Sequence, residues 1–415
     1  MITNQSHKIC GLVGKTLGHS FSPQIHNCLA DYSYSLFEIK EEDLESFIRS
    51  DKYHSVNVTI PYKKAVMPYL DEISDTAKQI GAVNVVTHLP DGRLYGDNTD
   101  FYGFCYMMRR ANISVCGKKA LILGTGGSSK TVSAALEFMR AESINFVSRN
   151  GDINYENVYD LCPDTQIIIN TTPVGMYPNN GISPIDIEKF SNLCGVADIV
   201  YNPKLTQFLL DAQRLGIPFT NGLPMLVAQA KSACEIFTGT SIDDGENEKI
   251  IKIIERQTQN IVLIGMPGCG KTTIGKLLSK KTGRMLIDTD EMVENIAGKS
   301  IPEIFSEYGE EEFRRIESET VAQAGKMSGV IISTGGGVVT KERNYSPLHQ
   351  NGKIFFVTRD TNKLSKDGRP LSMSGNVEDM YNIRLPLYRK FCDYEVENTT
   401  PSHAVQEILD IFENK

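Results

Sequence analysis

The chain has 415 residues, of which 40% are hydrophobic and 23% are charged, and its formal net charge is −8. The length predicts two or three domains, and the composition is that of an ordinary globular protein. The negative charge argues against a nucleic-acid partner, because such proteins present a basic surface. No apolar run approaches the roughly 20 residues that a membrane span needs.

The cysteines and the N-terminal residues predict the cellular compartment of the protein. The nine cysteines are odd in number and include no Cys-x-x-Cys pair, a pattern that suits neither a disulfide framework nor a zinc knuckle. Residues 1–8 lack the basic and then apolar pattern of a signal peptide. We therefore expect a cytoplasmic protein without a membrane partner, and the sequence leaves open whether it forms a homo-oligomer.

The first polar motif follows a strand pattern at residues 8–14, which runs into a glycine turn. Pro23 is well placed to open a helix. Ser20 and Ser22 lie just before and at the start of this helix, where two hydroxyl groups can hold a carboxylate. A helix cap is the simpler interpretation of Ser20 taken alone.

A second strand pattern alternates apolar and polar residues from residue 55 and ends at Pro61, which cannot lie inside a central strand. Asn57, Thr59 and Lys63 would project from this strand–loop junction, where sites tend to gather. An ordinary pair of surface lysines is the alternative for Lys63 and its neighbour Lys64.

Two further polar motifs complete the first hundred residues. Gly-Ala-Val-Asn ends at Asn84, and Gly-Asp-Asn-Thr-Asp ends at Asp100. A helix is expected near Phe101, so a helix cap is a reasonable alternative for Asp100.

These segments, in this order, resemble shikimate dehydrogenase, and the similarity continues to about residue 240. The resemblance implies a two-lobed α/β enzyme that reduces 3-dehydroshikimate to shikimate with NADPH. Residues 1–100 and 223–240 would form the substrate lobe, and residues 101–222 a Rossmann-like NADP lobe. Lys63 and Asp100 would be the catalytic pair. The substrate-binding residues would be Ser20, Ser22, Thr59, Asn84, Tyr201 and Gln229.

The expected NADP lobe opens with a strand, a glycine-rich turn and a helix at residues 119–131. Such a turn supports a dinucleotide pyrophosphate at the helix N-terminus, although Ser129 stands where a third glycine would fall. Arg149 follows the next strand in place of an acidic residue, which favours the 2′-phosphate of NADP. Asp152 and Glu156 lie close by, so the preference over NAD stays open. The expected cofactor residues are Gly124, Gly126, Gly127, Ser128, Arg149, Thr171, Gly222 and Met225.

Residues 241–258 separate this part from the rest of the chain. Their first half is polar, acidic and contains glycine, which is typical of a linker. Ile250–Thr258 is either a helical extension or more tether.

A phosphate-binding loop begins the last domain, expected at residues 259–415. A short apolar strand pattern leads into Gly-Met-Pro-Gly-Cys-Gly-Lys-Thr and then into a helical pattern, which is the context that this motif requires. Backbone N–H groups of such a loop converge on a phosphate. The expected ATP-binding residues are Gly268, Cys269, Gly270, Lys271, Thr272 and Thr273.

Later motifs of this domain supply acids, arginines and glycines. Thr272 and Asp288 could hold hydrated Mg²⁺, and Asp290 could polarise an acceptor hydroxyl. The whole domain resembles shikimate kinase, with Phe-Arg-x-x-Glu, three consecutive glycines, Arg-Pro-Leu and Arg-x-Pro-Leu-Tyr. The resemblance implies that Arg369 meets the transferring phosphoryl group. It also implies a shikimate site that contains Asp290, Arg314, Gly335, Gly336, Gly337 and Arg384.

The sequence therefore predicts an α/β, bifunctional enzyme of the shikimate pathway of aromatic amino acid biosynthesis, with NADPH, ATP and Mg²⁺ as cofactors. Shikimate made by the first half would be phosphorylated to shikimate 3-phosphate by the second. One alternative changes the first substrate to quinate. Another makes the phosphate-binding loop a regulatory nucleotide switch, which the arginines and the glycine turn disfavour, since a switch needs no carboxylate pocket.

Overall fold

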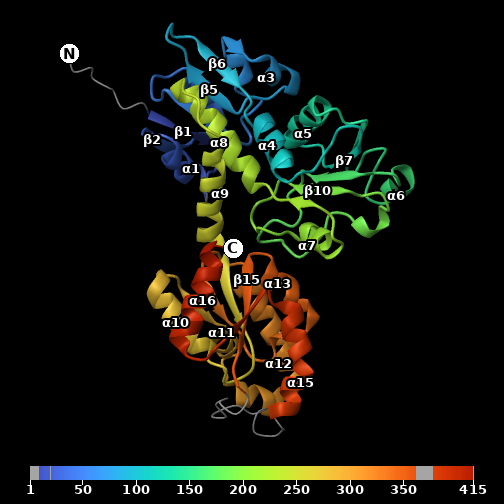
Figure 1. The fold of residues 1–415 in the computed structure, drawn as a ribbon. Helices are drawn as coiled ribbons and strands as arrows, with labels where there is room; N and C mark the ends of the chain where they lie inside the picture. The colour runs from blue at the N-terminus through green and yellow to red at the C-terminus, as the bar shows by residue number, and fades with distance from the viewer. Residues whose placement is uncertain (1–8, 19, 361–376, 415) are drawn as a thin grey trace, which may run out of the picture. The chain divides into compact units, whose positions relative to one another are not determined.

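The computed structural model describes residues 9–18, 20–360 and 377–414 (Figure 1). The chain divides into two compact units. The first contains Met1–Val174, Ser183–Tyr201 and Asp211–Lys252, and the second contains Gly175–Ile182, Asn202–Leu210 and Ile253–Lys415. Three sheets with helices around them confirm the predicted α/β class. None of the helices among the described residues is both long and apolar enough to cross a membrane.

The first unit begins with a six-stranded sheet in the order β2-β1-β3-β5-β6-β4. β1 is parallel to β2 and β3, whereas β3 and β6 are both antiparallel to β5. The ends of β1, β3 and β6 therefore meet the start of β5 at one edge of the sheet. The strands are β1 (Ile9–Gly14), β2 (Ser33–Glu38), β3 (Ser55–Val58), β4 (Glu72–Ile73), β5 (Val85–His88) and β6 (Leu94–Asp97). The helices among them are α1 (Ser22–Leu29), η1 (Glu41–Asp43), α2 (Leu44–Ile48), η2 (Met67–Tyr69) and α3 (Asp75–Ile80).

The second sheet is parallel, in the order β11-β10-β9-β7-β8. Its central strands are runs of fully buried aliphatic residues, as expected for a parallel sheet covered on both faces. The strands are β7 (Lys119–Leu123), β8 (Ser143–Val147), β9 (Ile167–Asn170), β10 (Gly195–Asp198) and β11 (Phe219–Thr220). The helices are α4 (Asp100–Arg110), α5 (Gly127–Phe138), α6 (Val158–Leu161), η3 (Ile187–Lys189) and α7 (Gln207–Arg214).

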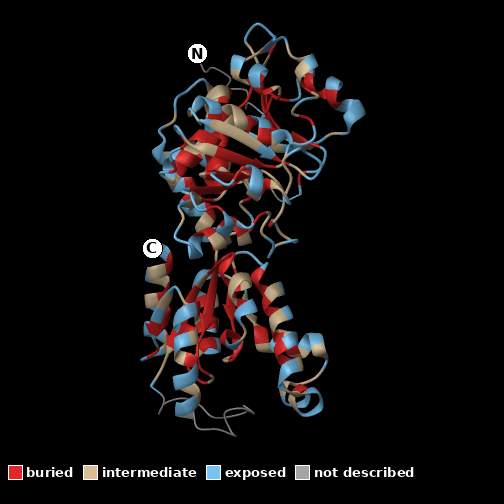
Figure 2. Cartoon of the chain, turned by 90° about the vertical axis from the view of Figure 1, so that its right-hand side faces the viewer, coloured by how far each residue is buried: buried red, intermediate tan, exposed pale blue. Residues whose placement is uncertain are grey.

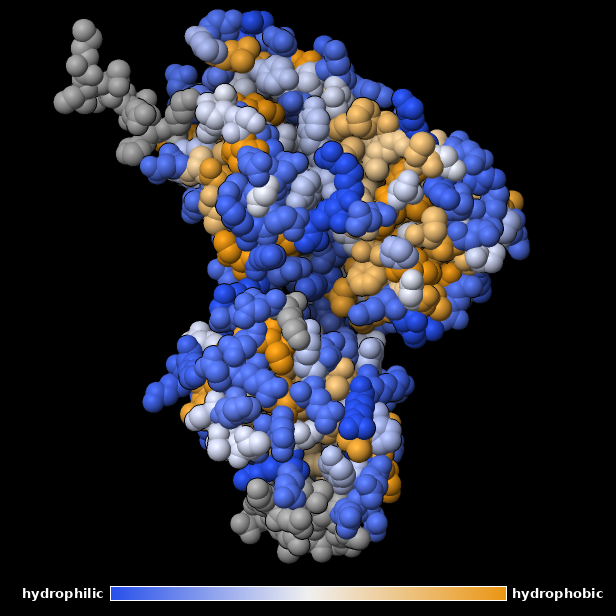
Figure 3. Space-filling view, in the orientation of Figure 1, coloured by the Kyte–Doolittle hydropathy of each residue, from blue (hydrophilic) through white to orange (hydrophobic). Residues whose placement is uncertain are grey.

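Apolar side chains remain exposed on the lobe that contains this second sheet. Figure 3 shows orange and light orange residues over the region where Figure 1 labels β7 and β10. Phe138, Phe146 and Leu161 are among the exposed large apolar residues of the lobe. Individual exposed apolar residues are normal on a globular surface and need no partner.

Helix α8 (Leu223–Thr238) connects the two lobes of the first unit, since it packs on α4, α1 and β5 (Figure 1). Pro224 lies in its first turn, and Gly239 ends it in the left-handed conformation with φ of 70°. Gly103 of α4 lies against α8 so closely that an added Cβ atom would be 2.6 Å from the carbonyl oxygen of Met225. This close contact fixes where α8 presents its side chains.

Helix α9 (Gly245–Thr258) occupies most of the segment that was expected to be a linker. Ile250, Ile251 and Ile254 are buried, so the helix has an apolar face. Glu248 accepts hydrogen bonds from Arg110 and from the hydroxyl group of Tyr106. The helical alternative for residues 250–258 is therefore the one that the structure shows, and the helix begins five residues earlier.

The second unit contains a five-stranded parallel sheet in the order β13-β14-β12-β15-β16. In Figure 1 helices α10 and α16 cover one side of it and α12, α13 and α15 the other, and Figure 2 shows that its strands are buried. The strands are β12 (Asn260–Ile264), β13 (Leu286–Asp288), β14 (Ile331–Ser333), β15 (Gly352–Thr358) and β16 (Tyr394–Glu397).

The helices of this unit follow the strands in the alternating pattern of a parallel sheet. Helix α12 has a capping box at Ser300 and Glu303 and a non-helical residue, Gly309, inside it. The helices are α10 (Lys271–Thr282), α11 (Thr289–Ala297), α12 (Ile301–Gly325), η4 (Val338–Thr340), η5 (Glu342–Asn344), α13 (Tyr345–His349), α15 (Val377–Phe391) and α16 (Pro401–Asn414).

We predict that Gly103→Val destabilises the first unit by about 1–3 kcal/mol, the usual range for overpacking, because valine must push α8 away from α4. Thermal unfolding would show the loss of stability. Tyr102→Ala is the matched control on the same helix, since Tyr102 is 47% exposed. Equal stability of Gly103→Val and the unchanged chain would show that this contact can relax.

Candidate active sites

A cavity of about 210 Å³ lies in the first unit, at the sheet edge where β1, β3 and β5 meet. The structure brings together in it all eight residues that the sequence assigned to catalysis and substrate binding in the first half of the chain. They are Ser20, Ser22, Thr59, Lys63, Asn84, Asp100, Tyr201 and Gln229. Asn57, which the sequence placed at this strand–loop junction without a specific role, also lines the cavity. Sequence reasoning did not single out four further lining residues: Leu12, Val58, Ile199 and Leu226.

Lys63 and Asp100 form an ion pair inside this cavity. The Nζ atom of Lys63 donates to Oδ2 of Asp100 at 2.5 Å, and the two side chains are 26% and 15% exposed. Asp100 is the first residue of α4, where the helix dipole favours a negative charge. The cap position belongs to Thr99, and no side chain caps the helix there, so Asp100 is free of the capping role that the sequence left open.

Hydrogen bonds fix the polar groups beside this pair. Oδ1 of Asn84 accepts from the backbone N–H of Thr99 at 2.7 Å, and Nδ2 of Asn84 donates to the Thr99 hydroxyl at 3.1 Å. Nε2 of Gln229 donates to the carbonyl of Leu226. Asn84 thus holds the start of α4 and with it Asp100.

Ser20 is not the cap residue of α1, which was the simpler interpretation of the sequence. Phe21 is the cap residue of α1, and no side chain caps that helix. Oγ of Ser20 accepts from the backbone N–H of Ser22 at 3.2 Å. Both serines line the cavity.

The residues expected to bind NADP fall into two groups. Ser128, Gly222 and Met225 line the cavity, whereas Gly124, Gly126, Gly127, Thr171 and Arg149 lie outside it. An added Cβ at either of the two glycines before and at the start of α5 would have open space around it. A phosphate can therefore approach the N–H groups of this helix N-terminus, so the local structure fits a dinucleotide. Arg149 is exposed just after β8.

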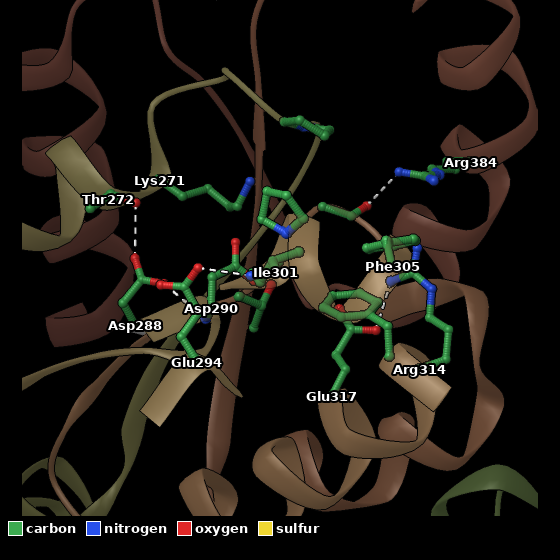
Figure 4. Close-up of a pocket in the computed structure, with 17 residues that line it drawn as sticks. Lys271, Thr272, Asp288, Asp290, Glu294, Ile301, Phe305, Arg314, Glu317 and Arg384 are labelled. Atoms are coloured by element: carbon green, nitrogen blue, oxygen red, sulfur yellow. Dashed lines mark hydrogen bonds and ion pairs between the residues drawn. The ribbon is translucent and has the colours of Figure 1, made fainter. Parts of the chain in front are cut away.

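A second cavity, of about 240 Å³, lies in the second unit (Figure 4). In this view Lys271, Thr272 and Asp288 lie on one side and Arg314 and Arg384 on the other. The expected residues that line it are Lys271, Thr272, Asp288, Asp290, Arg314, Gly335, Gly336, Gly337 and Arg384. Lining residues that the sequence did not single out include Pro267, Glu294, Phe305 and Glu317. Arg369 lies outside the described residues.

The phosphate-binding loop is folded around its own lysine. Nζ of Lys271 donates to the carbonyl oxygens of Gly265 at 2.8 Å and Met266 at 3.0 Å. Gly268 and Gly270 have φ values of 82° and 104°, which only glycine adopts readily. The side chain of Cys269 is buried, and its backbone N–H donates to the carbonyl of Met266 at 3.3 Å. Gly268, Gly270, Cys269 and Thr273 are not among the residues that line the cavity.

A hydroxyl and a carboxylate form a site that fits Mg²⁺. Oγ1 of Thr272 donates to Oδ2 of Asp288 at 3.0 Å, and Oδ1 of Asp288 accepts from the backbone N–H of Asp290 (Figure 4). Across the described residues no three acidic, histidine or cysteine side chains cluster as a metal site. Mg²⁺ commonly uses one or two protein oxygens and takes its other ligands from phosphates and water.

The three consecutive glycines lie against the other side chains of the cavity. An added Cβ would come within 2.6 Å of Oδ1 of Asp290 at Gly335, and within 2.1 Å of Nη1 of Arg314 at Gly337. Nη1 of Arg384 donates to the carbonyl of Gly336 at 3.1 Å. The turn therefore lies against Asp290, Arg314 and Arg384, and a larger residue at Gly335 or Gly337 would require the facing side chain to shift.

Arg314 is buried together with an acid. Its side chain is 4% exposed and that of Glu317 is 1% exposed, and Nη1 of Arg314 donates to Oε2 of Glu317 at 2.7 Å. Burial alone would lower the pKa of Arg314, but Glu317 and Glu310 raise it above its ordinary value. Burial raises the pKa of Glu317, and Arg314 opposes that shift. The site thus holds a permanent positive charge away from water.

Comparisons with known proteins match two separate parts of the chain to two families. The family model "Shikimate dehydrogenase substrate binding domain" matches residues 12–86, and the model "Shikimate kinase" matches residues 267–413. Shikimate dehydrogenase (NADP(+)) of Clostridium beijerinckii is 39% identical over 267 residues, which are 60% of this chain and 98% of that protein.

Two of the similar solved structures cover 60% and 59% of this chain. Shikimate dehydrogenase 1 of Peptoclostridium difficile is 40% identical, with a TM-score of 0.55 and 97% of its chain covered. Shikimate 5-dehydrogenase of Thermus thermophilus, solved with NADP(H) and shikimate, is 29% identical, with a TM-score of 0.54 and 99% covered. The chain therefore belongs to the shikimate dehydrogenase family through its first part and continues into a shikimate kinase domain.

Proposed function

We propose that the chain is a bifunctional enzyme for two consecutive steps. The first site reduces 3-dehydroshikimate to shikimate with NADPH, and the second converts shikimate to shikimate 3-phosphate with ATP and Mg²⁺. The observation that carries the proposal is the gathering of each motif set into its own cavity, one in each unit. The NADP(H) and shikimate bound by the Thermus thermophilus relative support the first assignment.

In the first site the ion pair of Lys63 and Asp100 supplies the proton that the reduction requires. NADPH supplies the hydride when it is bound. Lys63 donates a proton to the C3 oxygen of the ring, and Asp100 keeps the ammonium group oriented 2.5 Å away. Ser20, Ser22 and Tyr201 bind the carboxylate. The ring hydroxyls of the substrate are bound by Thr59, Asn84 and Gln229.

In the second site positioning and charge neutralisation are sufficient for phosphoryl transfer. ATP supplies the phosphoryl group when it is bound. Lys271 leaves the two backbone carbonyls that it contacts and turns to the outer phosphates. Thr272 and Asp288 hold Mg²⁺, and Asp290 polarises the acceptor hydroxyl of shikimate. Arg369, whose position is not described, is assigned to the transferring group by its motif alone.

The carboxylate of shikimate is assigned to the two buried arginines. Arg314 of α12 and Arg384 of α15 both lie against the glycine turn. Arg384 donates to the carbonyl of Gly336, and Nη1 of Arg314 would lie 2.1 Å from a Cβ atom added at Gly337. A planar guanidinium group is suited to a carboxylate because it can donate two parallel hydrogen bonds. A nucleotide switch would have no use for these two buried charges, so the kinase assignment is the better one.

We predict that the two activities separate by mutation. Lys63→Ala should slow NADPH oxidation by about 10²–10⁴-fold, the usual contribution of a general acid, and leave phosphorylation of added shikimate unchanged. Lys271→Ala should do the reverse, with a loss of orders of magnitude in ADP formation. The measurement is a coupled assay of the purified chain with 3-dehydroshikimate, NADPH and ATP–Mg²⁺.

Each variant serves as the folding control for the other in this assay. Omission of NADPH should also abolish ADP formation from 3-dehydroshikimate, and added shikimate should restore it. A folded variant that loses both activities would contradict the assignment of two independent sites.

We predict that Arg314→Lys raises the KM for shikimate by roughly 10- to 100-fold, since a charge-assisted hydrogen bond contributes about 1.5–3 kcal/mol. The KM for ATP should change little. Arg315→Lys is the matched control on the next residue of α12, because Arg315 is 50% exposed and pairs with Glu312 and Glu319. Similar effects of the two variants would contradict the carboxylate site.

We predict that Arg149→Ala raises the KM for NADPH by about tenfold and leaves that for NADH nearly unchanged, because only NADPH carries a 2′-phosphate. Steady-state kinetics with the two cofactors on one enzyme preparation provide the measurement and its control. Equal losses with both would assign Arg149 a structural role.

A further inference from the structure

A buried amide from outside the motif lies against the phosphate-binding loop. Asn398 directly follows β16 and is 4% exposed. Its Nδ2 atom donates to the carbonyl oxygen of Cys269 at 2.6 Å. A Cβ atom added at Gly270 would lie 2.5 Å from the same Nδ2 atom. The side chain of Asn398 therefore packs on the peptide group that joins Cys269 and Gly270.

The parallel sheet of the second unit holds this amide in place. The backbone N–H of Asn398 donates to the carbonyl of Thr358 at 2.8 Å, and Thr358 is the last residue of β15. β15 pairs with both β12 and β16. If the side-chain amide were turned over, its Oδ1 atom would face the carbonyl oxygen of Cys269, and two acceptors repel each other. The sheet thus presents one fixed donor to the loop.

The carbonyl that Asn398 binds decides where the next N–H group points. Within the described parts of the chain no cis peptide bond lies in this loop, so the bond between Cys269 and Gly270 is trans. In a trans peptide the C=O and N–H bonds point in opposite directions. The N–H group of Gly270 therefore points away from Asn398.

This N–H group is available to an anion. It donates to no protein acceptor among the residues that the structure describes. Gly270 is partly exposed and is the cap residue of α10, and no side chain caps this helix. Lys271, the next residue, lines the cavity. Unpaired N–H groups at a helix N-terminus, beside a lysine, are typical phosphate ligands.

We propose that Asn398 is a positioning residue for the nucleotide phosphates, which holds the carbonyl of Cys269 and thereby keeps the N–H of Gly270 directed at a phosphate. The inference rests on the proposed kinase function for the identity of the ligand, ATP. Without the amide the peptide group could turn over, because glycine permits many backbone conformations. A turned peptide would present the carbonyl oxygen of Cys269 to the phosphates and repel them.

The first test is a truncation of this amide in the full chain. We expect Asn398→Ala to raise the KM for ATP about tenfold and to change the KM for shikimate less than about twofold, because one contact to a charged group is weakened. Tripolyphosphate has no base and no ribose. Its binding, measured by calorimetry, should weaken by the same factor as that of ATP.

The matched control is Asn260→Ala. Asn260 is 1% exposed, and its Nδ2 atom donates to the carbonyl of Met327 at 2.7 Å. It is the first residue of β12, whereas the phosphate-binding loop follows the last residue of that strand. We expect this variant to lower the stability of the unit, as any loss of a buried hydrogen bond does, and to leave the KM for ATP unchanged.

The outcomes separate the inference from the function on which it rests. If the unchanged chain binds tripolyphosphate but forms no shikimate 3-phosphate from ATP and shikimate, the proposed function fails, and calorimetry still measures the role of Asn398. Equal losses of ATP affinity in the two variants would show that Asn398 acts only on stability. A weaker binding of ATP with unchanged binding of tripolyphosphate would place Asn398 at the base or the ribose and overturn the proposal.

A second test uses the unchanged chain. Labelling of the cysteine carbonyls with ¹³C and of glycine with ¹⁵N selects the Cys-Gly peptide groups in an NMR spectrum. The sequence has four of them: Cys10-Gly11, Cys116-Gly117, Cys194-Gly195 and Cys269-Gly270. The Cys269→Ser variant identifies the Gly270 signal by its loss. We expect tripolyphosphate to shift the N–H signal of Gly270 and to leave the other three in place. A Gly270 signal that does not move when tripolyphosphate binds would overturn the inference.

Discussion

Both cavities depend on one constraint, which is that the strands carrying their side chains end at a common edge of a sheet. In the first unit β3 is antiparallel to β5, so the residues after β3 lie beside those before β5, and Lys63 meets Asn84. In the second unit β13 and β14 are parallel, and Asp288 and Ser333 are partners in register. The acidic start of α11, directly after β13, therefore faces the glycine turn after β14. Ligand sites at the ends of parallel strands follow from this geometry.

At two glycines the backbone lies so close to a neighbouring element that it limits where the side chains of the cavities can lie. At Gly103 the neighbour is α8, which carries Gln229, and at Gly337 the neighbour is the guanidinium group of Arg314. Neither position has room for a Cβ atom. Because protein interiors are close-packed, such contacts leave a neighbouring helix or side chain few other positions. The functional side chains are thus positioned by packing of the backbone around them.

The motifs could be located from the sequence because strand ends and glycine turns leave local patterns. That is why Lys63, Asp100 and Lys271 could be singled out as candidates, and all three line the cavities. The hydrogen bond that Oδ1 of Asn57 accepts from the Tyr34 hydroxyl leaves no such pattern, since Tyr34 lies on another strand. For a related reason the sequence left both a helix and a tether open for residues 250–258, since the buried face of α9 becomes visible only in tertiary contact. Local patterns thus predict where a site lies, and long-range packing decides what each group can do there.

The two sites also differ in how they hold charge. Lys63 and Asp100 keep part of their surface in water, whereas Arg314 and Glu317 are almost fully buried. A buried ion pair is weak evidence for stability, because desolvation offsets most of the attraction. The partly exposed Glu310 completes the contacts of Arg314. In the proposed function an incoming carboxylate can exchange with Glu310 at a guanidinium group that Glu317 already holds in place. The desolvation of the arginine then occurs during folding and no longer opposes substrate binding.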